Sequence, residues 1–197
     1  MDPSVHHAMA RWPDVPAVFG YVGLDRRGTL YLEGAPVTHE RTAAFMRRNF
    51  GLDDHGRAFF QNGPQRAYAD LEVTPWVARL TSSDALVTHT EQAIHHLREA
   101  WLTSSGDLVL VTEFGPALVH AQDLDRMADH MSGEIANPAA GHAPLTLALL
   151  GEQLLIHSLA DDDLAGALGF QRQPEPAPGE PGAVAAHRPA WRRRPGA

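Results

Sequence analysis

The chain has 197 residues, of which 44% are hydrophobic and 20% are charged, a composition typical of a soluble globular protein that can bury a core. Its formal net charge of −8 argues against general binding to nucleic acid or to an anionic membrane surface, because either partner requires an excess of basic side chains. The absence of cysteine excludes disulfides, thiolate metal sites and thiol catalysis, and it fits a reducing cytoplasm.

The N-terminal region, residues 1–16, is expected to be an irregular arm because it contains several prolines around Trp12. Its first four residues have no basic stretch followed by an apolar core, so we expect no secretory signal. The longest apolar run, Leu145 to Leu150, is too short to span a bilayer. These features predict a cytoplasmic protein with no membrane partner.

Residues 17–81 are predicted to form a first β-rich half. Two apolar runs at 19–25 and 29–33, joined by a turn that contains glycine, predict a β-hairpin. A helix is expected to follow, with Thr38 as its N-cap and Gly51 as its stop.

The stretch 59–80 has the clearest turn and the longest alternating strand. Asn62-Gly63-Pro64 predicts a turn between two strands, since Asn and Gly tolerate positive φ and Pro lacks the backbone donor. Polar residues then alternate with apolar ones, which places them on one face. We expect that face to point outwards and to carry Arg66, Tyr68, Asp70 and Glu72. The strand is predicted to end at Thr74-Pro75, and a short strand to follow from Trp76.

Residues 82–170 are predicted to form a second β-rich half, separated from the first by a loop at 81–84. Strands are expected at 85–90, 108–112, 117–119, 145–150 and 153–159, and helices at 123–131 and 161–170. Residues 91–102 fit either a helix or a strand, and their second half favours a strand. Residues 171–197 are rich in Pro and Gly and are predicted to be a disordered tail.

The two halves share an internal echo. In residues 28–39 and 106–120, a turn glycine precedes an apolar strand, and a second glycine is followed five residues later by a histidine, as in Gly34 to His39 and Gly115 to His120. This spacing indicates a duplicated unit of hairpin, helix and hairpin, although glycine turns are common enough for chance to compete. The predicted fold class is therefore α+β, mainly β, with two similar small halves.

The sequence names no reaction. Its histidines form no HExxH arrangement and no Gly-x-Ser-x-Gly elbow is present, so we expect no metal, no cofactor and no catalytic residue of a known kind. The three aspartates Asp161, Asp162 and Asp163 are better explained by a helix N-terminus than by a bound Mg²⁺.

One set of aromatic and polar residues predicts a binding surface. A planar ligand can stack on Tyr or Trp while Arg binds a phosphate or carboxylate with two hydrogen bonds. The candidate ligand-binding residues are Gln65, Arg66, Tyr68, Glu72, Trp76 and Arg79. The competing explanation is structural: Tyr68 pairs across strands and Trp76 belongs to the core.

The segment from Gly28 to Leu80, which contains NGPQR and TPW, resembles two uncharacterised bacterial families. One is a domain-of-unknown-function family in which these two motifs recur, and the more distant one is domain of unknown function 1285, which has a similar order of hairpin, helix and strand. The resemblance extends over about residues 19–170. It implies a duplicated, mainly β core, a C-terminal half similar to a pleckstrin-homology domain, and a groove between the halves for a nucleotide-like ligand in signalling. Val73 and Trp76 depart from the motif of the second family.

Together these features predict a non-enzymatic cytoplasmic protein that binds a small, nucleotide-like ligand between its two halves in a regulatory role. The alternative is a protein-interaction adaptor that docks a partner on an exposed strand edge or apolar patch. A hydrolase of unrecognised type would require a pocket with converging titratable groups.

Overall fold

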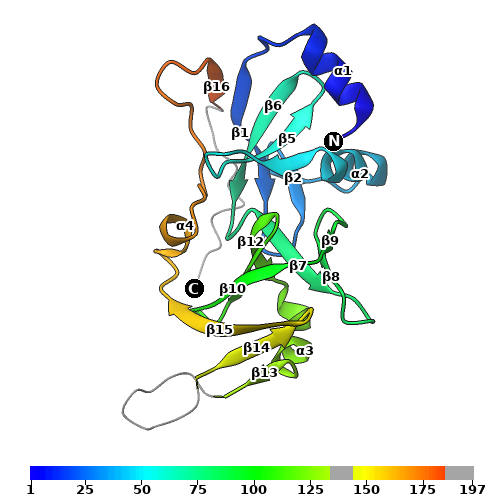
Figure 1. The fold of residues 1–197 in the computed structure, drawn as a ribbon. Coiled ribbons are helices and arrows are strands. Elements are labelled where there is room, and N and C mark those ends of the chain that lie inside the picture. The colour runs from blue at the N-terminus through cyan, green and yellow to red at the C-terminus, as the bar shows by residue number, and fades with distance from the viewer. Residues whose placement is uncertain (134–143, 185–197) are drawn as a thin grey trace. The chain divides into compact units, whose positions relative to one another are not determined.

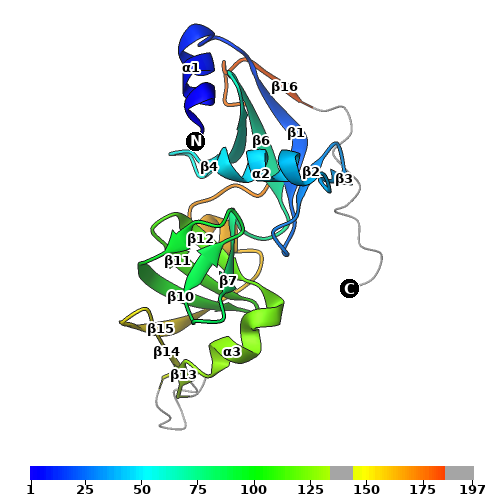
Figure 2. The same ribbon diagram turned by 90° about the vertical axis from the view of Figure 1, so that its right-hand side faces the viewer.

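The computed structural model describes residues 1–133 and 144–184. The chain divides into two compact units: the first contains Met1–Pro75 and the C-terminal segment from Gly169, and the second is Trp76–Leu168. Each unit is built on one β-sheet with few helices (Figures 1 and 2), which confirms a mainly β, α+β fold with two halves. The division falls at Pro75 and not at the loop 81–84, because that loop is a turn within the second sheet.

The sheet of the first unit contains two antiparallel runs of three strands and an added strand. Its strands are β1 (Ala17–Leu24), β2 (Leu30–Leu32), β3 (Ala35–Pro36), β4 (Phe50–Leu52), β5 (Ala58–Asn62), β6 (Gln65–Leu71) and β16 (Gly182–Val184). They lie in the order β3-β2-β1-β6-β5-β4, and β16 pairs with β1. The pairs β1–β6 and β1–β16 are parallel and the others are antiparallel. Both predicted hairpins are present, and α2 (Glu40–Arg48) lies between them in sequence.

The sheet of the second unit has the order β13-β14-β15-β10-β11-β12-β7-β8-β9. Its strands are β7 (Trp76–Leu80), β8 (Leu86–Thr88), β9 (Ala93–Ile94), β10 (Leu97–Thr103), β11 (Leu108–Thr112), β12 (Gly115–Val119), β13 (Met131–Ser132), β14 (Thr146–Leu149) and β15 (Glu152–Leu159). The ambiguous residues 91–102 therefore contain β9 and most of β10, and no helix. The helical elements are η1 (Ala121–Asp123), α3 (Leu124–Ala128) and α4 (Leu164–Ala167).

The two units contain the same topology. In the first, β1-β2-β3, then α2, then β4-β5-β6 form a sheet in which the first and last strands pair in parallel. In the second, β10-β11-β12, then η1 and α3, then β13-β14-β15 repeat that order, and β10 pairs in parallel with β15. The histidines of the sequence echo occupy equivalent positions: Nδ1 of His39 accepts a hydrogen bond from the backbone N–H of Thr42, and Nδ1 of His120 accepts one from Gln122. Each histidine caps a helical element.

Helix boundaries differ from the sequence expectation at several places. The N-terminal arm is a helix, α1 (Pro3–Arg11), because Pro3 suits the first helical position and Val5 is buried. Helix α2 is capped by His39, not by Thr38. Its last residue is Arg48, with Asn49 as the C-cap, so it ends before Gly51, which belongs to β4.

The predicted helix at 161–170 shrinks to α4. The carboxylate of Asp161 accepts hydrogen bonds from the side chains of Ser104 and Ser105 and does not cap a helix. These bonds hold the pKa of Asp161 at about 2, below its ordinary value.

The C-terminal segment is ordered over its described part, so the prediction of disorder is wrong for residues 171–184. The backbone N–H of Gln171 donates to the carbonyl of Gly56 at 2.8 Å, and that of Leu71 donates to the carbonyl of Arg172 at 2.8 Å. Strand β16 adds to the sheet. Backbone hydrogen bonds hold this segment, and a composition argument based on apolar side chains does not detect them. Residues 185–197, with the predicted basic end, lie outside the described residues.

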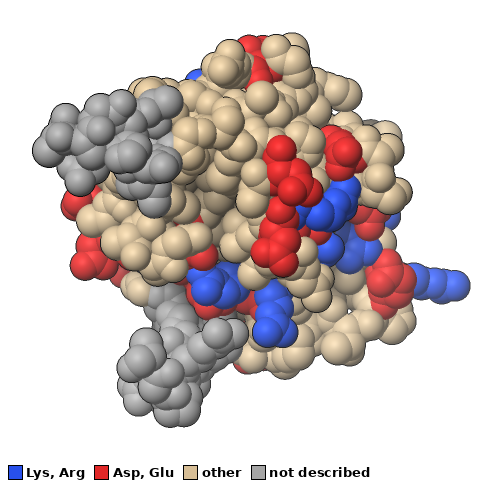
Figure 3. Space-filling model, turned by 90° about the horizontal axis from the view of Figure 1, so that it is seen from below, with Lys and Arg blue, Asp and Glu red and all other residues tan. Residues whose placement is uncertain are grey.

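Acidic and basic side chains lie intermixed on the face drawn in Figure 3, among a larger uncharged area. That face therefore differs from the continuous basic surface that nucleic acid attracts. Within the described residues, no helix combines the length and apolar character needed to cross a membrane.

Gly56 provides a test of how closely the C-terminal segment packs. A Cβ at Gly56 would lie 2.1 Å from the carbonyl oxygen of Gly169, and φ is +70°. Gly56→Ala should lower the free energy of unfolding by about 3 kcal/mol or more, because strain and steric overlap add. Gly63→Ala is the matched control: φ is +57° but the nearest atom lies 4.0 Å away, so about 1 kcal/mol is expected. Equal losses in denaturant unfolding would contradict the close packing at Gly56.

Candidate functional site

The six candidate residues are divided between the two units. Gln65, Arg66 and Tyr68 lie on β6 and Glu72 directly follows that strand, whereas Trp76 and Arg79 lie on β7 in the second unit. Of the six, Arg66 and Tyr68 line one hollow of the first unit. Gln65 lines a different one, because neighbouring residues of a strand point to opposite faces.

Three of the candidates have structural partners. The indole N–H of Trp76, which is 3% exposed, donates to the carbonyl of Phe114 at 2.9 Å. Nε of Arg79 donates to Asp123 Oδ2 at 2.7 Å. Glu72 accepts the backbone N–H of Arg26 at 3.0 Å. These contacts fit the structural explanation of Trp76 and connect Arg79 and Glu72 to their own units.

Tyr68 and Asp70 are buried, so the expected outward-facing row on β6 is wrong at these two positions. Their exposed fractions are 2% and 1%. The ring of Tyr68 stacks on Phe19 with centroids 4.7 Å apart, and the guanidinium of Arg57 lies 4.3 Å from the Tyr68 ring centroid. Polar and apolar residues therefore alternate along β6 even though both faces of the strand are buried at Tyr68 and Asp70. The second face is covered because Arg57 and the C-terminal segment pack against it.

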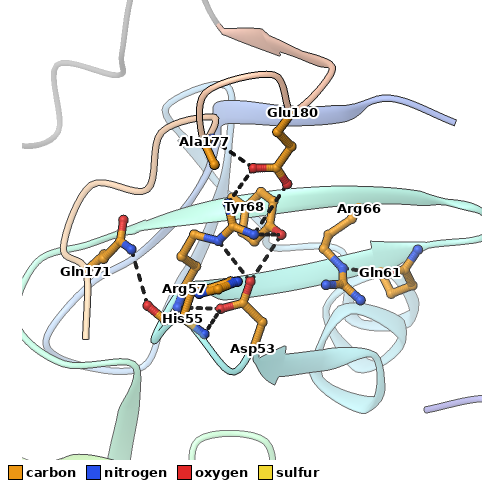
Figure 4. Close-up of polar contacts among 9 residues, drawn as sticks. All are labelled: Asp53, His55, Arg57, Gln61, Arg66, Tyr68, Gln171, Ala177 and Glu180. Atoms are coloured by element: carbon orange, nitrogen blue, oxygen red, sulfur yellow. Dashed lines mark hydrogen bonds and ion pairs between the residues drawn. The ribbon is translucent and has the colours of Figure 1, made fainter. Parts of the chain in front are cut away.

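A buried ion cluster around Arg57 is the polar feature that the sequence did not reveal (Figure 4). Its guanidinium donates to Asp53 Oδ2 at 2.9 Å, to Glu180 Oε2 at 2.7 Å and to the Tyr68 hydroxyl at 2.7 Å. The Tyr68 hydroxyl in turn donates to Asp53 Oδ2 at 3.2 Å. Asp53 lies in a turn that suggested nothing beyond a reversal of the chain, and Glu180 is 123 residues from Arg57, so no local pattern connects them.

Electrostatics in this cluster favours the charged forms. Burial alone would raise the pKa of Asp53, but hydrogen bonds from the backbone and side chain of Arg57 outweigh it and lower that pKa. The hydrogen bond from Arg57 lowers the pKa of Glu180. Burial would lower the pKa of Arg57, yet Glu180 and Asp53 raise it overall. Burial raises the pKa of Tyr68, so this phenol stays protonated.

Arg66 lines the hollow beside this cluster, and its guanidinium is close enough to Tyr68 to oppose the rise in the pKa of that phenol (Figure 4). Its Nε donates to Gln61 Oε1 at 3.2 Å, and its guanidinium lies 4.0 Å from the centroid of the Phe59 ring. Gln61 is itself oriented, because its amide donates to the carbonyl of Gly63 at 3.1 Å. Among the described residues, no carboxylate lies within ion-pairing distance of Arg66.

We name this cavity the Arg66 hollow. Its volume is about 360 Å³, and its lining includes Met9, Pro13, Asp14, Gln61, Arg66, Tyr68 and Glu180. It therefore presents a cation with no ion-pair partner among the described residues, carboxylates and apolar side chains, a combination that suits a small ligand with an anionic group and hydrogen-bond donors. No three metal-ligating side chains converge within the described ranges.

Comparisons with known proteins address the family and the fold. The DUF2944 family model, described as "Protein of unknown function (DUF2946)", matches residues 1–175. No curated protein matches the chain. A DUF1285 family protein from Silicibacter pomeroyi has 15% sequence identity and a TM-score of 0.52, covering 78% of this chain and 86% of its own. A DUF1285 family protein from Shewanella baltica has 12% identity and a TM-score of 0.45, covering 55% and 91% respectively. The resemblance to domain of unknown function 1285 is thus confirmed at the level of the fold.

The Arg57 cluster predicts a specific response to acid. Because the pKa values of Asp53 and Glu180 are lowered in the folded state, their contribution to stability is complete above the unfolded values of about 4 and is lost as pH falls through the folded values. Asp53→Asn should cost about 2–4 kcal/mol at neutral pH, since an amide N–H₂ would replace the acceptor that faces buried Arg57.

Hydrogen exchange at β5 and β6 measures this stability within the first unit. The variant should lose less stability than wild type between pH 5 and pH 2 (about the range over which carboxylates protonate). Asp54→Asn, one residue further along the same turn, is the control. If the stability of Asp53→Asn and that of wild type changed in parallel with pH, Asp53 would not contribute to the acid response.

Proposed function

We propose a function from the site alone, because the chain belongs to the DUF2944 family, whose description names no activity. The proposed function is reversible binding of a small, nucleotide-like anion in the Arg66 hollow, in a regulatory or signalling role. The observation that carries it is a guanidinium oriented by Gln61 and Phe59 with no described ion-pair partner.

Arg66 is suited to an anion because its orientation is set before a ligand arrives. A guanidinium has five N–H donors in a fixed plane, and in this one the hydrogen bond to Gln61 uses Nε. The remaining donors can meet a phosphate or carboxylate in pairs. The Phe59 ring beneath the cation restricts its motion, so little conformational entropy is lost on binding.

The rest of the hollow supports a ligand that also carries donors. Asp14 and Gln61 supply oxygen acceptors, while Pro13 and Pro64 supply apolar surface. A nucleotide combines a phosphate with amino or ring N–H groups and a planar apolar face, and a volume of about 360 Å³ lies within the usual range for small-molecule sites, about 300–1,000 Å³. Trp76 and Arg79 are not part of this proposal, because their partners Phe114 and Asp123 lie in the second unit.

A regulatory role is favoured over a catalytic one by the state of the neighbouring titratable groups. Arg57, Asp53 and Glu180 are hydrogen-bonded to one another, and the pKa of each is shifted toward its charged form. Groups stabilised in this way are poor at exchanging protons near neutral pH. We place the function in the cytoplasm, which the lack of cysteine supports.

Binding by Arg66 can be tested with a panel of nucleoside mono-, di- and triphosphates, measured by titration calorimetry. At least one should bind wild type, and Arg66→Ala should weaken it by about tenfold to a hundredfold, the value of a charge-assisted hydrogen bond. Arg66→Lys should restore only part of the affinity, because an ammonium lacks the planar pair of donors.

Arg47→Ala is the matched control. Arg47 is on α2 of the same unit, it does not line the hollow, and it pairs with Glu40 at a distance of 2.7 Å. It should bind as wild type does. If no nucleotide binds wild type, or if Arg66→Ala and Arg47→Ala lose affinity equally, the proposal is wrong.

A second candidate function, that of a protein-interaction adaptor, is favoured by one observation. Strand β16 is a short C-terminal strand that adds in parallel to the edge of β1, and strand addition is a common way for a sheet to bind an extended peptide. This function uses the backbone of β1 and not the Arg66 donors, although Ala17, Glu180 and Pro181 also line the Arg66 hollow.

A further inference from the structure

The C-terminal segment lies on the first unit in the manner of a bound peptide. Ala17, Val18 and Phe19 of β1 pair on one side with Gly182, Ala183 and Val184. Strand β2 pairs with β1 only from Val22 onward, so without the segment this part of β1 would present unpaired backbone groups. An open strand edge of this kind is a template for an added chain.

A preformed turn precedes the added strand. The backbone N–H of Glu180 donates to the carbonyl of Ala177 at 2.9 Å, and the residues between them are Pro178 and Gly179, with φ of +83° at the glycine. Proline followed by a glycine with positive φ is the signature of a type II turn. The turn fixes the direction of the Glu180 side chain, whose Oε2 also accepts the backbone N–H of Ala177 at 2.9 Å.

Glu180 is the anchor of this segment. Its carboxylate accepts hydrogen bonds from both terminal nitrogens of Arg57, at 2.7 Å and 3.3 Å. Every other residue from Ala177 to Val184 is exposed. The segment is therefore held by one ion pair and by backbone bonds, and elements with so few buried contacts open most readily.

Small residues are required after the anchor. A Cβ at Gly182 would lie 2.7 Å from Cε2 of Phe19, so the ring of Phe19 leaves no space for a side chain. The surface thus selects a defined chemical pattern: a Pro-Gly turn, then a glutamate, then a glycine two residues later that begins a strand.

We propose that Arg57 and the edge of β1 form a peptide-binding site, that residues 177–184 occupy it as an internal ligand, and that a partner protein binds there with an extended segment of the same pattern. This inference deepens the adaptor function and does not depend on the Arg66 hollow binding a nucleotide. Because the internal ligand is tethered, its effective concentration is high, so a partner gains access when the segment is released.

The test uses the full chain and a fluorescent peptide with the sequence of residues 169–184. In Glu180→Gln the internal segment loses its anchor while Arg57 and β1 are unchanged. This variant should bind the peptide about tenfold or more tightly than wild type. Gly182→Val blocks the internal strand at Phe19 and leaves Glu180 intact. It should also raise the affinity for the peptide, by a cause that is independent of the Glu180 anchor.

Two controls separate recognition from general loosening. A peptide with Gln in place of the residue equivalent to Glu180 should not bind, and Glu40→Gln, which removes the exposed Arg47–Glu40 pair, should bind no better than wild type. Hydrogen exchange at Leu71, whose N–H donates to Arg172, should accelerate in Glu180→Gln and slow again when the wild-type peptide is added.

If neither segment variant binds the peptide better than wild type, or if the Gln peptide binds equally well, the site does not exist as proposed. Arg66→Ala, combined with Glu180→Gln, should still bind the peptide. Because Glu180 and Pro181 also line the Arg66 hollow, nucleotide binding is measured in Arg66→Ala alone, which leaves the segment in place. Loss of nucleotide binding in that variant, with peptide binding retained in the double variant, implicates only the Arg66 donors.

Discussion

The first unit depends on the burial of a single charge, that of Arg57. Its side chain is 8% exposed, and a guanidinium in that environment is stable only when carboxylates and hydrogen bonds replace its lost water. Asp53 supplies one carboxylate from the preceding turn and Glu180 supplies the other from the far end of the described chain. The need to neutralise this charge thus ties the C-terminal segment to the sheet. It also explains why Tyr68, on a face that the sequence predicted to be outward, is buried.

The repeated topology shows how two similar sheets protect different edges. In the second unit, β12 pairs with β7, so the edge that corresponds to β3 is covered by the extra strands β7–β9. In the first unit β3 is a strand of two exposed residues, and the open part of β1 is covered by β16 instead. Exposed edges invite association. Here one unit covers its edge with the three strands β7–β9 that precede β10 in the chain, and the other with a segment that a single glutamate anchors.

Features set by neighbouring residues were predictable, and features set by distant ones were not. The turn at Asn62-Gly63, the hairpins and the spacing of His39 and His120 follow from local backbone preferences. The burial of Tyr68 comes from packing against Phe19 and Arg57, and the order of residues 171–184 comes from contacts such as Arg57–Glu180 across more than a hundred positions. Composition alone carries no trace of either. For the candidate site, Arg66 keeps a ligand role as a proposal, whereas Trp76 and Arg79 have structural partners that only coordinates reveal.

Arg57 and Arg66 lie close together in the first unit, but one has a structural role and the other is the proposed ligand-binding residue. The chain carries 24 acidic residues against 16 basic ones, so carboxylates are plentiful. Arg57 pairs with two of them, and Arg79 and Arg126 each pair with one. Arg66 is held over Phe59 by an amide. Pairing with an amide keeps the guanidinium oriented without neutralising it, whereas a carboxylate there would compete with any incoming anion. The choice of Gln61 as its partner is therefore the feature that distinguishes a binding arginine from a structural one.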